Sequence, residues 1–182
     1  MPTTMSTARS EPPAAAPAGR PAAAPGVDPR ALREACGQFL TGVTVVTSTD
    51  GENPFGMTAN SFTSVSLDPP MVLFCPHKDA KIRELIDRSG CFAINVLSAE
   101  QAELSRRFSH RVTVCFGDTP TRIGVSGAPV LTEALAYLDC RVVREIAAGD
   151  HTIVLGEVLD AGRPRADARP LAFFRGGFAG LA

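Results

Sequence analysis

The stretch that most limits what this chain can fold into is residues 55–70, FGMTANSFTSVSLDPP. Small and hydroxyl-bearing side chains alternate in it with apolar ones, and a double proline closes it. A two-residue period over this length predicts a β-strand with one face buried. The other face would carry short hydrogen-bonding groups and could hold a flat ligand with polar edges. On the pattern alone, a strand with a polar solvent face is the simpler interpretation.

The rest of the chain predicts a mainly β fold with hairpin connections. Further strands are expected at residues 43–48, 71–75, 91–97, 136–146, 151–161 and 171–174. Helices are expected at residues 29–41, 78–88 and 98–108, and an irregular loop at residues 109–128. The strand–helix alternation of a parallel doubly wound sheet is absent. We therefore expect an antiparallel barrel with a few peripheral helices.

The chain divides into a tail and one domain. Residues 1–27 are rich in proline and alanine and cannot bury enough apolar surface to fold, so we predict a disordered tail. The prolines interrupt every candidate for the continuous apolar core of a signal peptide. Residues 28–182 suit a single domain, which begins with a helix capped by Asp28 and ended by Gly42.

Composition excludes several classes of function. With 18 basic and 19 acidic residues, the formal charge of −1 gives no electrostatic reason to bind nucleic acid or an acidic membrane. No apolar run approaches the roughly 20 residues of a membrane-spanning helix. The 5 cysteines are far apart and predict reduced thiols in a cytoplasmic protein, and the 3 scattered histidines predict no metal site.

Three places could bring polar groups together for chemistry. The first is the polar face of residues 58–66. The second is residues 77–81, His-Lys-Asp-Ala-Lys, where a helix start and two lysines could hold a phosphate. The third is the Gly-Asp-His turn at residues 149–151. Each also has a plainer interpretation as ordinary surface. The motifs of Rossmann nucleotide sites, P-loops and serine hydrolases are absent.

Several motifs occur together, in one order: GVTVVT, GMTANSFTSVSL-x-PP, FAINVL, LS-x-x-F, GAPVL and GDHTI-x-x-GEV. In this combination the chain resembles the short-chain flavin reductase family. These proteins are the reductase components of two-component flavin-dependent monooxygenases, such as those that act on phenol and 4-hydroxyphenylacetate. The likeness covers roughly residues 30–178 and leaves out the tail.

The resemblance implies an FMN-binding split barrel that works as a homodimer. It implies NAD(P)H-dependent reduction of FMN or FAD, with hydride passing from nicotinamide C4 to flavin N5. The reduced flavin would then diffuse to a partner monooxygenase, so that flavin is as much a substrate as a cofactor.

The resemblance also assigns residues. It places His151 at the nicotinamide, as the catalytic residue, and Lys81 near the flavin phosphates. Phe178 falls where many members have a tyrosine near the nicotinamide. The other expected cofactor-binding residues are Thr58, Ala59, Asn60, Ser61, Ser64, Val65, Cys75, Ala80, Phe108 and Ser109.

Two departures from the family pattern concern the nicotinamide site. Phe178 lacks a tyrosine hydroxyl, and Val-Cys stands at residues 114–115, where a charged pair is common. They leave open a non-redox split-barrel module that binds flavin or haem without turnover. A third alternative, an oxidase related to pyridoxamine phosphate oxidases, needs an extra basic substrate site that the sequence does not show. The choice between FMN and FAD, or NADH and NADPH, also stays open.

Overall fold

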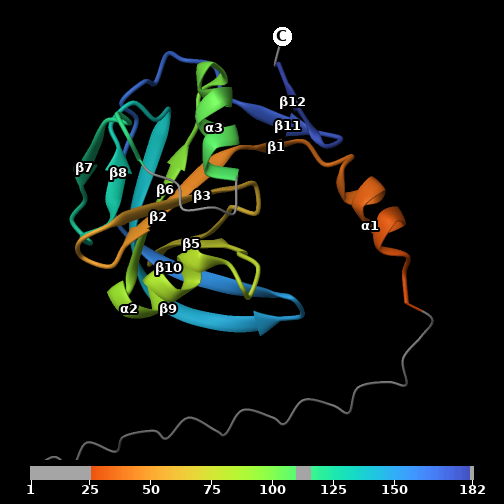
Figure 1. The fold of residues 1–182 in the computed structure, drawn as a ribbon, viewed down its shortest axis with the longest axis horizontal. Helices are drawn as coiled ribbons and strands as arrows, with labels where there is room; N and C mark the ends of the chain where they lie inside the picture. Colours follow the sequence, from red (N-terminus) through yellow and green to blue (C-terminus); the bar gives the residue numbers. More distant parts are fainter. Residues whose placement is uncertain (1–25, 110–115, 181–182) are drawn as a thin grey trace, which may run out of the picture.

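The computed structural model describes residues 26–109 and 116–180, and a seven-stranded antiparallel sheet forms its body (Figure 1). Its strands are β2 (Thr44–Thr49), β3 (Pro54–Ala59), β4 (Thr63–Leu67), β5 (Pro70–Phe74), β6 (Cys91–Val96), β9 (Ala136–Ala148) and β10 (His151–Gly162). Their order in the sheet is β3-β2-β6-β9-β10-β5-β4. The prediction of a mainly β, antiparallel fold is confirmed.

Smaller elements surround this sheet. A three-stranded sheet contains β1 (Thr41–Gly42), β11 (Ala172–Phe174) and β12 (Gly177–Ala179), and a hairpin contains β7 (Thr121–Ile123) and β8 (Pro129–Leu131). The helices are α1 (Pro29–Cys36), α2 (Lys81–Ser89) and α3 (Ala102–Ser109), the last preceded by the short 3₁₀ turn η1 (Ala99–Gln101). Within the described ranges, no helix is long and apolar enough to cross a membrane.

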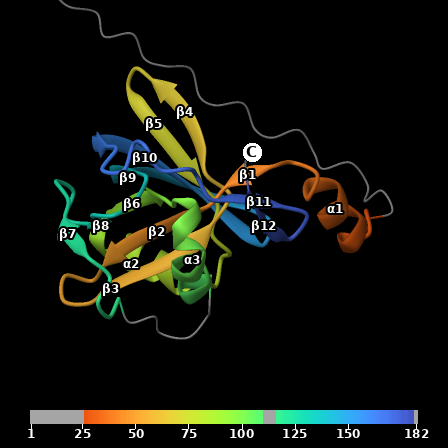
Figure 2. The same ribbon diagram turned by 90° about the horizontal axis from the view of Figure 1, so that it is seen from above.

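The prediction of one half-buried strand over residues 55–70 is wrong. The chain forms β3 and β4 there, which pair with β2 and β5 at opposite edges of the sheet. Residues 60–62 join the two edges and can span at most about 14 Å, so the sheet curls until its edges approach at one end. The side chains of β4 are mostly exposed, because the β4–β5 hairpin stands clear of the body (Figure 2).

Two apolar clusters hold the fold together on either side of β3. Phe55 faces the first cluster, which includes Phe74, Phe92 and the buried side of α2. Gly56 faces the second, where a Cβ would lie 2.5 Å from the ring of Phe108 on α3. Only glycine therefore lets α3 pack this closely on β3. Burying each such ring contributes about 1.5–3 kcal/mol.

Buried polar groups connect the smaller elements to the sheet. Asn95 of β6 donates from Nδ2 to the Val45 carbonyl at 2.9 Å and accepts from the Leu131 amide at 2.8 Å. Asp139 of β9 accepts from the Ser126 amide at 2.8 Å and from its hydroxyl. A buried polar group left unpaired would cost stability, so these bonds fix β8 and its turn against the sheet.

The first helix differs from its prediction. Asp28 caps α1 as expected, but the helix ends at Cys36 and not at Gly42. Gly42 lies in β1, where it pairs with Ala172 of β11. No residue of α1 is buried, and Leu32 is 54% exposed. Figures 1 and 2 both show α1 apart from the main sheet.

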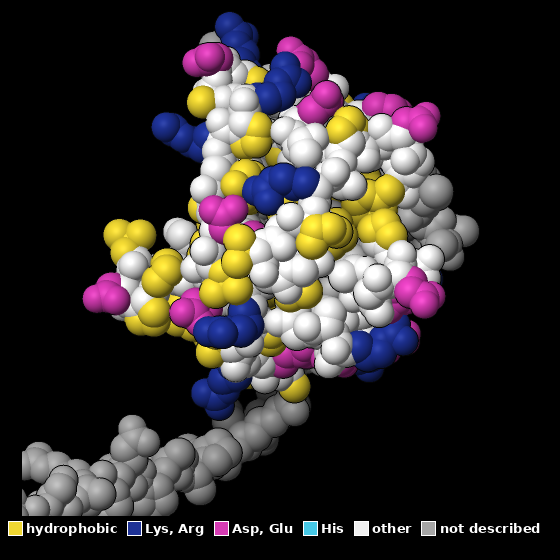
Figure 3. Space-filling view, turned by 90° about the vertical axis from the view of Figure 1, so that its left-hand side faces the viewer, with side chains coloured by type: hydrophobic (Ala, Val, Ile, Leu, Met, Phe, Trp, Pro, Cys, Tyr) yellow, Lys and Arg dark blue, Asp and Glu magenta, His cyan; other side chains and the backbone are white. Residues whose placement is uncertain are grey.

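Two further expectations need correction, and one lies mostly outside the described residues. The expected loop at residues 109–128 contains strand β7, and the glycine-rich end contains β12. Residues 110–115, with the Val-Cys departure, and nearly all of the expected tail are not described. The face in Figure 3 mixes charges of both signs with hydrophobic side chains, in keeping with the net charge of −1.

Candidate functional site

A cleft of about 250 Å³ lies where the end of β3 meets α3 and the β11–β12 hairpin. Nine residues of the described ranges line it: Val43, Thr58, Ala59, Asn60, Ser105, Arg106, Ser109, Phe173 and Phe178. Thr58, Ala59, Asn60, Ser109 and Phe178 are among the residues that the family resemblance assigns to the cofactor site. The fold thus brings together expected site residues that are up to 120 positions apart in the sequence.

The floor of the cleft is the fixed end of an edge strand. The Thr58 hydroxyl donates to the Ser105 carbonyl at 2.6 Å, and the Thr44 hydroxyl donates to the Ala59 carbonyl at 2.7 Å. Because β3 has a partner on one side only, half of its backbone groups point away from the sheet. The Asn60 side chain is exposed and makes no hydrogen bond within the described part of the chain. Its amide and the outward backbone groups are therefore available to a ligand.

The hydroxyl groups of the 58–66 face mostly serve the fold. Thr58 bonds to α3, and Ser61 bonds to the backbone of Cys75, accepting from its amide at 3.0 Å and donating to its carbonyl at 3.2 Å. Each hydroxyl oxygen keeps at least one lone pair as an acceptor, but each hydrogen is already donated to a carbonyl. Thr58 and Ser61 therefore hold the floor of the cleft in place and do not act as hydrogen-bond donors to a ligand.

Aromatic rings and one cation form the opposite wall. The ring centroids of Phe173 and Phe178 lie 6.1 Å apart at an interplanar angle of 69°, across the β11–β12 pair. The Arg106 guanidinium lies over the Phe178 ring, 5.1 Å from its centroid. Ser109 donates its hydroxyl to the Arg106 carbonyl at 2.7 Å and so closes the end of α3. An aromatic wall opposite a polar strand edge suits a flat heteroaromatic ring.

The other two candidate places, residues 77–81 and residues 149–151, lie side by side. The backbones of His77 and His151 form a bridge, and their ring centroids lie 5.4 Å apart, edge to face. His151 Nδ1 lies 2.8 Å from Asp150 Oδ1, and this hydrogen bond lowers the pKa of Asp150 below its ordinary value. The Ser61–Cys75 bonds connect the cleft to this cluster, because His77 follows Cys75 by two residues.

The start of α2 lies next to this histidine pair. Ala80 precedes α2 and makes no side-chain cap, so the amide groups of the first turn lack a side-chain acceptor. The Lys78 amide donates to the Asp150 carbonyl at 2.9 Å. Lys81 Nζ lies 5.4 Å from the centroid of the Phe55 ring, on the side of β3 that faces α2. Helix amides and nearby lysines can hold a phosphate group.

Seven expected cofactor residues lie outside the cleft lining: Ser61, Ser64, Val65, Cys75, Ala80, Lys81 and Phe108. Ser64 and Val65 are exposed on the projecting hairpin. The Phe108 side chain is 1% exposed and belongs to the core beneath Gly56, so only its backbone could reach a ligand. Burial raises the pKa of the Cys75 thiol, which keeps the sulfur protonated and poorly nucleophilic.

Sequence reasoning missed four lining residues: Val43, Ser105, Arg106 and Phe173. Ser105 is the serine of the LS-x-x-F motif, and Arg106 occupies its first unspecified position. A helical projection would have put Ser105 and Ser109 on one face, because residues four apart lie together on a helix. No comparable signal in the sequence joins Arg106 to Phe178. Among the described residues, no three His, Cys, Asp or Glu side chains gather as metal ligands.

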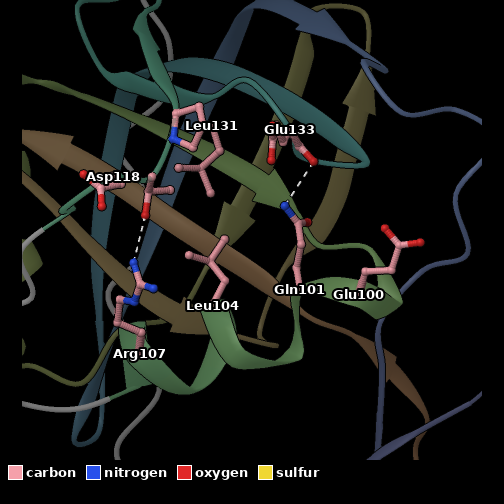
Figure 4. A pocket seen from close by; sticks show the side chains of 9 residues that line it. Glu100, Gln101, Leu104, Arg107, Asp118, Leu131 and Glu133 are labelled. Atoms are coloured by element: carbon pink, nitrogen blue, oxygen red, sulfur yellow. Dashed lines mark hydrogen bonds between the residues drawn. The ribbon is translucent and has the colours of Figure 1, made fainter.

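A second hollow, of about 280 Å³, lies on the other side of α3 (Figure 4). Three of its polar side chains are bonded to the protein. Gln101 donates to the Glu133 carbonyl at 3.0 Å, and Arg107 donates to the Thr119 hydroxyl at 3.1 Å. Glu100 pairs with Arg165 at 2.6 Å. None of the expected site residues lies here, so the cleft is the better candidate.

Comparison with known proteins identifies the family of the chain. Residues 36–182 match the flavin reductase-like domain. The chain is 39% identical, over 156 residues, to HsaB, the reductase subunit of a flavin-dependent monooxygenase of Mycobacterium tuberculosis, covering 85% of this chain and 83% of that one. It is 48% identical, over 153 residues, to the FMN reductase (NADH) SmoA of Agrobacterium fabrum, covering 84% and 86%.

A solved structure gives the same result. The NADH:FAD oxidoreductase SgcE6 of Streptomyces globisporus superposes with a TM-score of 0.79 at 45% identity, covering 88% of this chain and 99% of that one. The resemblance inferred from the motifs is confirmed. The chain belongs to the family of flavin reductase-like domains.

Proposed function

We propose that the protein is an NADH-dependent flavin reductase that reduces FMN or FAD and supplies the reduced flavin to a separate flavin-dependent monooxygenase. One observation carries the proposal: the free Asn60 amide, the unpaired edge of β3 and the aromatic wall at Phe178 face one cleft. The NADH-dependent activities of SmoA and SgcE6 support NADH as donor, and the role of HsaB as a reductase subunit supports a monooxygenase partner.

The residues of the cleft have complementary tasks in this proposal. A bound flavin supplies the redox chemistry, and the protein binds and orients the reactants. Asn60 and the edge of β3 hydrogen-bond the polar edge of the ring system. Phe173 and Phe178 cover the apolar part and keep water from the reacting faces. Lys81 and the amides of α2 neutralise flavin phosphate charge at the start of α2. His151 orients the nicotinamide.

The test of this activity uses the purified protein, NADH and free flavin. NADH oxidation, followed by the near-ultraviolet absorbance of NADH, should be stimulated by FMN or FAD, and NADPH should replace NADH poorly. Flavin binding without NADH oxidation would instead select the non-redox module. No binding and no oxidation would reject both.

His151 gives a specific prediction about the donor site. His151→Ala removes a hydrogen-bonding ring held by Asp150 and should raise the KM for NADH about tenfold, the value of one good hydrogen bond, with little change in kcat. His151→Asn keeps a polar side chain and should lose less. Unchanged KM and kcat in both variants would remove His151 from the site.

The proposal includes a homodimer, whose second copy covers α1. An isolated helix of eight residues is marginal in water, yet no residue of α1 is buried within one copy. Leu32 and Phe39, which is 76% exposed, would lie against the second copy. Sedimentation equilibrium should give twice the chain mass at micromolar concentration, and a monomer there would contradict this part.

We also place the protein in the cytoplasm. Cys91 and Cys140 are buried, unpaired thiols, which is typical of proteins from reducing compartments.

A further inference from the structure

Among the described residues that line the cleft, Arg106 is the one charged side chain. We infer that Arg106 binds the diphosphate of the nicotinamide dinucleotide and thereby positions the nicotinamide ring beside Phe178. This inference rests on the proposed function and assigns a role to a residue that the motifs leave unspecified.

The surroundings of Arg106 leave its guanidinium free to accept an anion. Its Nη1 lies 3.0 Å from Glu103 Oε2, but the two side chains are 57% and 81% exposed. An exposed ion pair within one helix contributes little, so a phosphate group can replace Glu103. The contact of the guanidinium with the Phe178 ring requires no hydrogen-bond acceptor, so it leaves the N–H groups of Arg106 available.

The size of the cleft puts the phosphates near its mouth. Sites that enclose a whole drug-sized ligand measure roughly 300–1,000 Å³. A cleft of about 250 Å³ takes a ring system but not a dinucleotide. The phosphates of a ligand whose ring enters the cleft must therefore lie outside, where an exposed cation can reach them.

Lys81 and Arg106 lie on opposite faces of β3. Phe55 and Met57 point toward the cluster with α2, where Lys81 lies over the Phe55 ring. Gly56 and Thr58 point toward α3, which carries Arg106. Because alternate residues of a strand face opposite sides, Lys81 and Arg106 cannot share one phosphate easily. If the α2 start holds the flavin phosphate, Arg106 is left for the dinucleotide.

Arg107 is a matched control for Arg106. It is the next residue of the same helix and has the same charge, but it donates to Thr119 on the other side of α3 (Figure 4). Replacing either arginine by glutamine removes one positive charge from the last turn of α3. Any effect through net charge or through the helix dipole is therefore the same in both variants.

The experiment compares two hydride donors: NADH and a neutral N-benzyl-dihydronicotinamide, which has no phosphate. Arg106→Gln should raise the KM for NADH about tenfold or more, leave kcat nearly unchanged, and leave the KM for the neutral donor unchanged. The salt dependence of the NADH KM should weaken as well. Arg106→Lys should recover part of the loss, and Arg107→Gln should behave as the original protein.

Each contrary result has a defined meaning. An equal rise in KM for both donors would show that Arg106 acts only by supporting Phe178, and would overturn the inference. A rise in the KM for FMN, but not for riboflavin or NADH, would assign Arg106 to the flavin phosphate and overturn it too. No change in Arg106→Gln would do the same. If the original protein reduces flavin with neither donor, the proposed function itself fails.

Discussion

The two sides of α3 face hollows of nearly the same size, and they differ in how their polar groups are used. On one side, Ser105 and Arg106 face the cleft of about 250 Å³ together with the free amide of Asn60. On the other, Gln101 and Arg107 face a hollow of about 280 Å³ and donate to protein acceptors.

This contrast shows that volume alone does not identify a binding site. Folded proteins satisfy nearly all of their buried polar groups, so exposed groups with spare hydrogen-bonding capacity are what a ligand can use. The cleft has such groups beside two aromatic rings, whereas in the second hollow the side chains of Glu100, Gln101 and Arg107 are bonded to the protein. The following substitutions test the contrast, in decreasing order of expected effect.

Gly56→Ala should have the largest effect, because it pushes α3 away from the strand that forms the floor of the cleft. The new Cβ would lie 2.5 Å from the buried Phe108 ring. Overpacking of this kind costs about 1–3 kcal/mol of unfolding free energy, measurable by urea denaturation, and should also lower flavin reduction. Gly42→Ala is the control, because a Cβ there meets nothing within 4 Å. Equal stability of the two variants would contradict close packing at Gly56.

Thr58→Val should have an intermediate effect, since valine keeps the shape but loses the 2.6 Å bond to Ser105. We expect a loss of about 1 kcal/mol in stability and a several-fold rise in the KM for flavin, because the floor of the cleft is no longer fixed to α3. Thr119→Val removes the acceptor of Arg107 in the second hollow and should leave the kinetics unchanged. If both substitutions change the flavin KM equally, the two hollows are not functionally distinct.

Glu100→Gln should have the smallest effect. It breaks the exposed pair with Arg165 in the second hollow, and such pairs contribute about 0–1 kcal/mol. The thermal midpoint should hardly move, and steady-state constants for NADH and flavin should be unchanged. An altered KM for either substrate would place a ligand in that hollow.

Local signals made much of the fold predictable. The Asp-Gly turn between β2 and β3, the apolar face of α2 and the Gly-Asp turn between β9 and β10 all depend on residues close in sequence. The break of residues 55–70 into two strands was not predictable. The alternation is interrupted at residues 60–62, Asn-Ser-Phe, but such an interruption carries no information about a change of partner strand.

For the site, family motifs indicated the positions on β3 and the two histidine-containing segments. They could not indicate which of Arg106 and Arg107 faces the cleft, because that depends on the rotation of α3 on the sheet. The rotation is set by Phe108 packing against Gly56, a contact between residues 52 positions apart. Phe173 was missed for the same reason, since β1 brings it to the cleft through tertiary pairing.

The short link at residues 60–62 has a consequence for how this chain can vary. It contains Asn60, which lines the cleft, and it also connects the two edge strands of the curled sheet, β3 and β4. Extra residues in the exposed turn between β4 and β5 would only lengthen a projecting tip. Extra residues in the link would let the two edge strands move apart and would also displace the amide of Asn60. Insertions should therefore be tolerated at the tip and selected against at the link.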